Sequence, residues 1–289
     1  MTEPTIVAPA YARLPVTDLA LAGRFVTEFL GLPPGPAIEG GACFRASQRQ
    51  HDLSFVTDAA ATASGFECRD EAAFDRAAEA LAGAGFPVRR ADVGECAHRL
   101  VDAALLTRDR SGNAIDLVLR PHYNGRRCHL LRDTGIRFLH GIGLRSTDVE
   151  GDLAFWAALG AVVSDRVGDI TYLRIDDHHH RIALHPADRP GVLNTVFAVE
   201  SLDQVMQAYY HAAEHQIRVL HGPGREAVSG LVFVHLAGPD GTIFSLVSGN
   251  DDIGARQHRP RRFPFTTESL CTWGSVCTEV PEWRTEAAL

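Results

Sequence analysis

Gly141-Ile-Gly-Leu-Arg-Ser-Thr-Asp148 repeats an earlier phrase of the chain, Tyr11-Ala-Arg-Leu-Pro-Val-Thr-Asp18. In both copies an alternating strand pattern leads to an aspartate, a residue type that caps helices by accepting backbone N–H groups. A helical pattern follows and closes on a Leu-Gly pair, at Leu30-Gly31 in the first copy and at Leu159-Gly160 in the second. Because self-similarity at a long interval indicates repeated structural units, the sequence predicts two similar modules.

The repeat continues beyond these phrases. Asp70-Glu-Ala-Ala-Phe74 and Ser201-Leu-Asp-Gln-Val205 each begin a second helical pattern. Leu106–Val118 and Leu236–Val247 each contain a glycine turn between two strand patterns. Each copy therefore has the order β-α-β-β-β, with a fainter division into two shorter βαβββ halves. We predict an α+β fold in which tandem modules form curved sheets around clefts.

The repeat also sets the expected boundaries. We expect an N-terminal module at residues 1–122, a linker at 123–136, a C-terminal module at 137–250 and a C-terminal extension at 251–289. Of the two clefts, the one in the C-terminal module is the expected active cleft.

Composition excludes several classes of protein. The 289 residues carry a net charge of -8, which argues against a nucleic-acid partner. No apolar run approaches the roughly 20 residues that span a bilayer, and the N-terminus lacks the basic start of a signal peptide. The six scattered cysteines form no CxxC pair, so we expect neither structural zinc nor disulfides, and a cytoplasmic location.

On these residues the chain resembles the vicinal-oxygen-chelate (glyoxalase/bleomycin resistance/extradiol dioxygenase) superfamily. Within it the chain is most similar to type I extradiol ring-cleaving dioxygenases, of the 2,3-dihydroxybiphenyl and catechol 2,3-dioxygenase kind. The stretches that carry the resemblance are Gly141 to Gly160, His178-His-His-Arg-Ile-Ala-Leu-His185, Asn194 to Val205, Gly238 to Val247, and the tail Arg259 to Gly274. The resemblance implies a small aromatic or phenolic ligand and a homo-oligomer.

The same resemblance places a metal site at positions that lack metal ligands here. The family uses two histidines and a carboxylate, which leave open positions on Fe(II) for a catecholate and dioxygen. The corresponding residues are Gly141, seven residues before Asp148, then Asn194 and Ser245. None of them can replace an imidazole or a carboxylate as a metal ligand. We therefore predict no metal and no other cofactor at the usual site.

His140, next to Gly141, is the one histidine that could compensate. Strand alternation turns it to the opposite face of the sheet, whereas a local bulge would return it to the cleft. There it would contact substrate or hold Fe(II) or Mn(II) in a shifted register. The matching positions of the N-terminal copy are Tyr11, Ala63 and Asp116, which offer one carboxylate and no histidine.

Other family positions keep groups that can move protons. The family's proton-transferring histidine corresponds to His180, and two positions that hold substrate oxygens correspond to Glu226 and His235. We predict these three as catalytic residues, because imidazole and carboxyl groups act as general acids and bases. Tyr172 matches an aromatic position of the cleft, and we expect it to bind substrate together with Asn194, Ser245 and His140. His178 and His179 are expected to be exposed polar residues.

A new metal site elsewhere is weakly indicated. His211 and His215 lie four residues apart on a predicted helix, which is a ligand spacing. Glu214 does not occupy the glutamate position of an HExxH motif, so a solvated helix face is the favoured interpretation.

Three hypotheses for function follow. The favoured one is a metal-independent enzyme that uses acid–base chemistry on a phenolic, catechol-like or polyketide-like molecule; isomerisation, dehydration, C–C cleavage and cofactor-free oxygenation remain open. The second is a metal-dependent ring-cleaving dioxygenase with a shifted metal site. The third is a non-catalytic small-molecule binding or resistance protein. A shared fold cannot choose among them.

Overall fold

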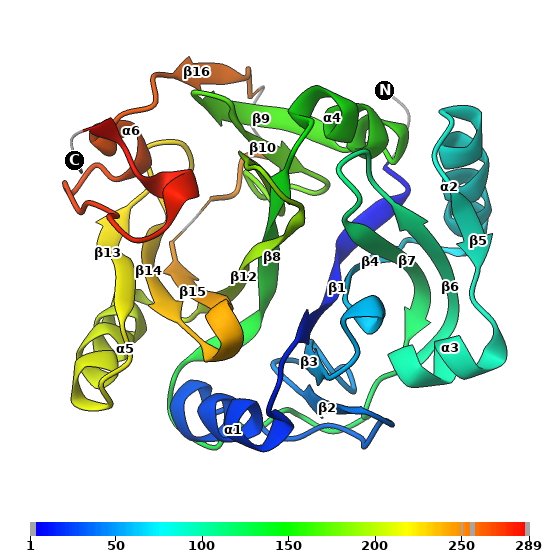
Figure 1. Cartoon of the computed structure of the whole chain (residues 1–289), viewed down its shortest axis with the longest axis horizontal. Helices are drawn as coiled ribbons and strands as arrows, with labels where there is room; N and C mark the ends of the chain where they lie inside the picture. Colours follow the sequence, from blue (N-terminus) through cyan, green and yellow to red (C-terminus); the bar gives the residue numbers. More distant parts are fainter. Residues whose placement is uncertain (1–3, 250, 255–257, 287–289) are drawn as a thin grey trace.

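The chain forms two curved sheets that lie side by side, with most helices on their outer faces (Figure 1). The structure is a computed structural model that describes residues 4–249, 251–254 and 258–286. One sheet has seven strands and the other has nine. Among these residues, no helix is long and apolar enough to cross a bilayer. The predicted α+β fold with tandem curved sheets is confirmed.

The first sheet is built from the N-terminal copy of the repeat, in the order β2-β3-β1-β4-β7-β6-β5. Its strands are β1 (Ile6–Pro15), β2 (Gly41–Phe44), β3 (Leu53–Val56), β4 (Ala63–Cys68), β5 (Val88–Arg90), β6 (Val101–Arg108) and β7 (Ala114–Pro121). Its helices are α1 (Leu19–Arg24), the π-helical η1 (Phe25–Leu30), the 3-10 turn η2 (Ala59–Ala61), α2 (Glu71–Gly83) and α3 (Val93–Arg99).

The second sheet follows the same plan, in the order β13-β14-β15-β12-β8-β11-β10-β9-β16. Its strands are β8 (Ile136–Ser146), β9 (Val162–Val167), β10 (Ile170–Arg174), β11 (Ile182–Pro186), β12 (Gly191–Val199), β13 (Val219–Arg225), β14 (Val232–Ala237), β15 (Ile243–Ser248) and β16 (Arg261–Phe263). Its helices are α4 (Val149–Ala158), α5 (Leu202–Glu214), the turn η3 (Pro239–Gly241), α6 (Thr267–Leu270) and the turn η4 (Pro281–Trp283).

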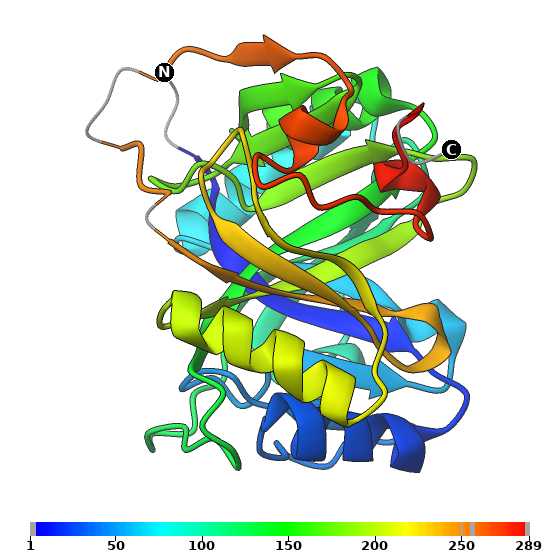
Figure 2. The ribbon, with the colours of Figure 1, turned by 90° about the vertical axis from the view of Figure 1, so that its left-hand side faces the viewer.

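Strand pairing shows that the two sheets are copies. In the first, β1 pairs antiparallel with β4 and parallel with β3, and β4 pairs parallel with β7. In the second, β8 pairs antiparallel with β12 and parallel with β11, and β12 pairs parallel with β15. Equivalent strands of the two copies therefore pair in the same way. In Figure 2, α5 lies across the outer face of the second sheet, and the C-terminal segment lies at the other end of that sheet.

The repeated helix signals act as predicted. The Asp18 carboxylate accepts from the backbone N–H groups of Ala20 and Leu21, and the Asp148 carboxylate accepts from that of Gly151. Gly31 and Gly160 have φ values of 71° and 87°, the left-handed conformation that favours glycine after a helix.

The first helical segment of each copy packs against the other copy. Trp156 of α4 is fully buried, with its ring 4.9 Å from that of Phe66 in β4. Phe25 of η1 lies 5.5 Å from Phe244 of β15, measured between ring centroids. These reciprocal contacts place both sheets around one continuous apolar core.

A buried polar contact also joins the two copies. The fully buried Asp152 carboxylate of α4 accepts from the backbone N–H of Ser111 at 2.9 Å and from the hydroxyl groups of Ser111 and Ser146, each at 2.5 Å. A buried charge of this kind is tolerated because it is fully hydrogen-bonded.

Candidate active site

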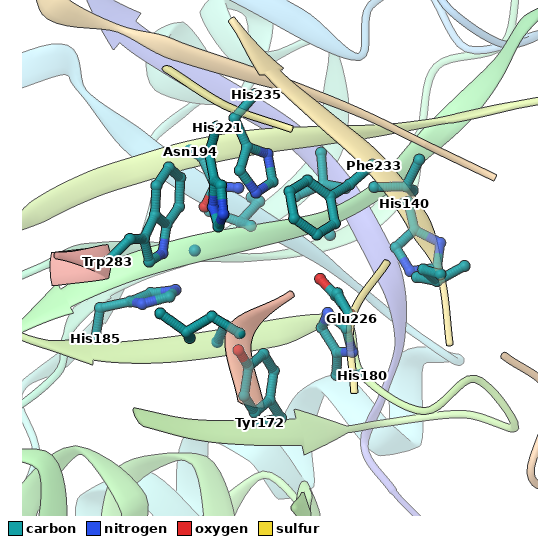
Figure 3. Close-up of a pocket in the computed structure, with 18 residues that line it drawn as sticks. His140, Tyr172, His180, His185, Asn194, His221, Glu226, Phe233, His235 and Trp283 are labelled. Atoms are coloured by element: carbon teal, nitrogen blue, oxygen red, sulfur yellow. The ribbon is translucent and has the colours of Figure 1, made fainter. Parts of the chain in front are cut away.

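A polar cavity of about 50 Å³ lies within the second sheet (Figure 3). Residues of β8 and of β10 to β15 line it, and Leu270 and Trp283 of the C-terminal segment contribute to its wall. Six predicted site residues line this cavity: His140, Tyr172, His180, Asn194, Glu226 and His235. A volume of this size holds a few water molecules, whereas an aromatic ring needs about 150 Å³, so a phenolic ligand enters only if lining side chains move.

The positions expected to hold the family's metal meet on adjacent strands. Asn194 of β12 donates from Nδ2 to Ser245 Oγ of β15 at 2.7 Å. Across the other side of β12, Asn194 is paired with Gly143, and a Cβ atom at Gly143 would lie 2.0 Å from Asn194 Oδ1. A Cβ atom at Gly141 would instead meet the backbone oxygen of Arg181 at 2.7 Å. Asn194 thus pairs with Gly143, whereas Gly141, the position that the resemblance assigns to a ligand, pairs with Val196.

His140 lies at an irregularity of β8. Val196 pairs with Gly141 while Phe197 pairs with Leu139, so the register shift leaves His140 as the extra residue of β8. Such a bulge reorients one side chain, and His140 is buried in the wall of the cavity. The expectation that alternation turns His140 away from the cleft is therefore wrong.

The ring nitrogens of His140 have identifiable neighbours. Arg181 Nη1 lies 3.3 Å from Nδ1, so Nδ1 faces a donor and Nε2 carries the proton in the neutral ring. Nε2 lies 3.4 Å from Asp251 Oδ2. Burial lowers the pKa of His140, and the opposing pull of Asp251 does not reverse this direction.

His180 is buried and faces the cavity between Tyr172 and Glu226 (Figure 3). The Tyr172 ring packs edge-on against it at a centroid distance of 4.9 Å. Burial, with the neighbouring His179 and His140, holds the pKa of His180 well below its ordinary value. Its imidazole is therefore neutral near pH 7 and can accept a proton.

The two other histidines of the triplet are not simply exposed. His179 is 1% exposed and lies 2.9 Å from Asp165 Oδ2 through Nε2. His178 is partly buried, and its Nδ1 lies 3.2 Å from Asp176 Oδ2 and 2.9 Å from Arg181 Nη2. The prediction of two solvated side chains is wrong because this loop folds back onto the sheet and needs polar partners there.

Glu226 and His235 face the same cavity from different sides (Figure 3). Burial raises the pKa of Glu226 to about 7, although Ser229 donates to its Oε2 at 2.5 Å. His235 is stacked between Phe233 and Trp283, each at a ring distance of 4.5 Å. Burial also holds the pKa of His235 well below its ordinary value. Near neutral pH the cavity thus contains neutral imidazoles and a carboxyl group close to half-ionised.

Four histidine or aromatic residues of the lining escaped the sequence interpretation: His185, His221, Phe233 and Trp283. His185 lies two residues after Ala183 on β11, so strand alternation from that cavity residue could have found it. Phe233 lies in the same way two residues before His235 on β14. Trp283 belongs to the C-terminal segment, where no strand register indicates a direction.

The residues around the family's metal position do not fit a metal. Gly141 has no ligand atom in its side chain, and the side chains of Asn194 and Ser245 are hydrogen-bonded to each other. Among the described residues, two groups of three potential ligand residues have ligand atoms within 4.8 Å of one another, and neither lies at this position. They are Asp165, His179 and His258, and His211, Glu214 and His215.

Each of these two groups has other partners. The Asp165 carboxylate already accepts from the guanidinium and the backbone N–H of Arg261. On α5, the His211 ring stacks on Phe29 at 5.2 Å, and His215 Nδ1 lies 3.0 Å from the backbone oxygen of His211. His211 is therefore packed against η1, not fully solvated as predicted.

At the corresponding place in the first module the polar groups pair with one another, beside a cavity of about 450 Å³ that Arg99 and Asp116 line. Tyr11 donates to Asp116 Oδ2 at 2.9 Å, and Arg99 Nε donates to the same oxygen at 2.8 Å. Arg13 is fully buried and donates to the backbone oxygens of Ala61 and His98. These paired groups leave the polar cavity of the second module as the candidate site.

Part of the chain matches a known protein family. Residues 138–246 match the family model described as the Glyoxalase/Bleomycin resistance protein/Dioxygenase superfamily. No curated protein sequence matches the chain.

Solved structures share the fold of the whole chain at low sequence identity. An extradiol ring-cleaving dioxygenase from B. fuscum has a TM-score of 0.86 and 21% identity, over 98% of this chain and 83% of that one. The Mn(II)-bound glyoxalase from Novosphingobium aromaticivorans has a TM-score of 0.85 and 19% identity, over 98% and 95%. A halotolerant catechol dioxygenase has a TM-score of 0.81 and 19% identity, over 90% and 92%. Residues 138–246 therefore match the Glyoxalase/Bleomycin resistance protein/Dioxygenase superfamily model, and the chain as a whole shares its fold with these solved structures.

Proposed function

We propose that the second module binds a small phenolic or catechol-like molecule and transfers its proton without a metal at the family position. One observation carries the proposal: polar groups surround the cavity, while Gly141, Asn194 and Ser245, which the resemblance aligns with the family's metal ligands, offer no imidazole or carboxylate. A site that had lost all function would be expected to fill with apolar side chains, because unpaired buried polar groups are costly.

Unpaired atoms in the cavity support a polar ligand. Asn194 Oδ1, His185 Nδ1 and His235 Nδ1 are buried and have no hydrogen-bond partner in the described part of the chain. Each can pair with a hydroxyl or oxygen substituent of a ring, the amide oxygen as an acceptor and the imidazoles as a donor or an acceptor. Trp283, Phe233 and Tyr172 supply apolar surface for the ring itself.

The proposed chemistry begins with a single proton transfer. The phenolic O–H bond breaks, its proton passes to His180 Nε2, and the electron pair stays on the ligand oxygen as a phenolate. Glu226, with a pKa of about 7, can then donate a proton to a ring or side-chain carbon, or take one from it. His235 holds the second ligand oxygen by a hydrogen bond.

Two alternative functions remain, a metal-dependent dioxygenase and a non-catalytic binding protein. A shifted Fe(II) or Mn(II) site would require His140 and Asp251 together with a further ligand, and the described residues do not bring such a third group within 4.8 Å of both. A non-catalytic binding protein would use the same cavity without proton transfer. Cytoplasmic location and homo-oligomerisation stay predictions.

The test uses 4-nitrocatechol, whose colour reports its ionisation, with protein treated with a chelator. The proposal predicts that wild-type protein binds the probe and ionises it at a pH where the free probe is protonated, and that His180→Gln loses this effect. Binding that needs added Fe(II) or Mn(II) would support the shifted metal site instead. Binding with equal ionisation in wild type and His180→Gln would contradict proton transfer by His180.

A further inference from the structure

A chain of buried hydrogen-bonding groups leads from the cavity into the sheet behind it. His180 Nδ1 lies 3.1 Å from His179 Nδ1, and His179 Nε2 lies 2.9 Å from Asp165 Oδ2. The exposed fractions of these residues are 7%, 1% and 0% for His180, His179 and Asp165. Water therefore has little access to any of these contacts, and the contacts themselves fix where the protons lie.

Asp165 is held as a carboxylate at the far end of this chain. The backbone N–H of Arg261 donates to Oδ1 at 2.7 Å, and Arg261 Nη2 donates to Oδ2 at 2.5 Å. Burial alone would raise the pKa of Asp165, but the hydrogen bonds from His179 and Arg261 outweigh burial and lower it. An ionised carboxylate can only accept hydrogen bonds.

The proton positions of both histidines follow from this constraint. Because Asp165 only accepts, the Nε2 atom of His179 must carry a proton. A neutral His179 then has an unprotonated Nδ1, which can only accept. His180 must therefore donate from Nδ1, and its Nε2 is left unprotonated as the ring nitrogen available to the cavity.

We propose that Asp165 and His179 are positioning residues that hold His180 in the tautomer whose unprotonated Nε2 serves as the base. This inference rests on the function proposed above and extends it beyond the residues that touch the ligand. When His180 takes the ligand's proton at Nε2, the positive charge that forms lies next to neutral His179, which is hydrogen-bonded to a carboxylate. The same contacts thus orient the base toward the ligand.

Other charged and titratable groups also face His180. His140 lies 6.0 Å away between ring centroids, on β8, and Tyr172 lies 4.9 Å away, on β10. Asp251 and Arg181 contribute opposite effects to the pKa of His180, and Glu226 lies across the cavity. None of these groups contacts His180 Nδ1, so they do not decide which ring nitrogen carries the proton.

The decisive variant is His179→Phe, which keeps a ring but removes the acceptor for His180 Nδ1. Free imidazole side chains favour the Nε2–H tautomer, so His180 should change to that form. The matched control is His258→Gln, since His258 Nε2 lies 3.3 Å from Asp165 Oδ1 but has no contact with His180. His179→Gln offers an amide oxygen in place of Nδ1 and should restore part of the wild-type behaviour.

Two readouts decide the outcome. Nitrogen-15 NMR of labelled histidines, with His180 assigned by its loss in His180→Gln, should show an unprotonated Nε2 in wild type and in His258→Gln. The ratio of ionised to protonated 4-nitrocatechol bound at a fixed pH should fall about tenfold in His179→Phe, the effect of losing one hydrogen bond to a charged group.

The inference and the proposed function can fail separately. A wild-type His180 with a protonated Nε2 overturns the inference even if His179→Phe does not fold, and so does a His179→Phe variant with unchanged tautomer and ionisation. If His180→Gln itself ionises the probe like wild type, the proposed function fails instead.

Discussion

Replacing Glu226 by glutamine tests whether its carboxyl group is shielded from water in the cavity, as its raised pKa indicates. The folded protein holds the pKa of Glu226 at about 7, against an ordinary value of 4.5. Because folding raises the pKa of Glu226, the contribution of this group to the free energy of unfolding is fully present below pH 4.5. It is lost as the pH rises through 7. The difference of about 2.5 pKa units corresponds to about 3 kcal/mol, at about 1.36 kcal/mol per unit.

The assay is urea unfolding of wild type and Glu226→Gln at pH 4.5 and pH 8.5. Other groups titrate over this range, but they titrate in both proteins and cancel in the difference between them. We expect the glutamine variant to gain about 3 kcal/mol relative to wild type between the two pH values. Glutamine keeps an oxygen that can accept from Ser229, so this hydrogen bond is not the source of the change. A stability difference independent of pH would refute the reasoning, since Glu226 would then ionise as in water.

Three further predictions follow from other parts of the chain. Burial lowers the pKa of His185 to about 3, so the contribution of this residue to stability is present above pH 6.5 and is lost as the pH falls. In urea unfolding, the free energy of unfolding of His185→Gln should gain about 3 kcal/mol on that of wild type between pH 7.5 and pH 4. No gain would mean that this ring is hydrated. Asp152→Ala removes the acceptor shared by Ser111 and Ser146 and should lower the free energy of unfolding by about 3 kcal/mol, whereas a change below about 0.5 kcal/mol would contradict the role of this contact between the modules. Trp283→Ala should cost about 3 kcal/mol and should speed the binding of 4-nitrocatechol in stopped-flow mixing, and an unchanged rate would show that access does not pass this residue.

The sequence predicted the fold because its signals were local and duplicated. The caps at Asp18 and Asp148 and the closing glycines Gly31 and Gly160 act within a few residues of their own position. Strand pairing then follows from the repeat itself, since two copies of one pattern build two copies of one sheet.

The candidate site was predicted less completely because it depends on contacts between distant segments. The bulge at His140 shifts one register by a residue, and no local signal distinguishes it from a regular strand. The burial of His179 depends on Asp165, fourteen residues away, and on Arg261 of the C-terminal segment. Trp283 reaches the cavity from the same segment. His180, Asn194 and His235 were found because the resemblance aligns them with family positions, whereas residues placed by contacts between distant segments were not found.

Metal content tests the central claim most directly. Protein purified without oxygen would be incubated with Fe(II) or Mn(II), freed of excess metal, and analysed for bound metal and for ionisation of 4-nitrocatechol. The account predicts protein that retains almost no metal and still ionises the probe through His180. Near-stoichiometric metal, with ionisation that disappears when the metal is removed, would contradict it and would favour ring cleavage at a shifted metal site.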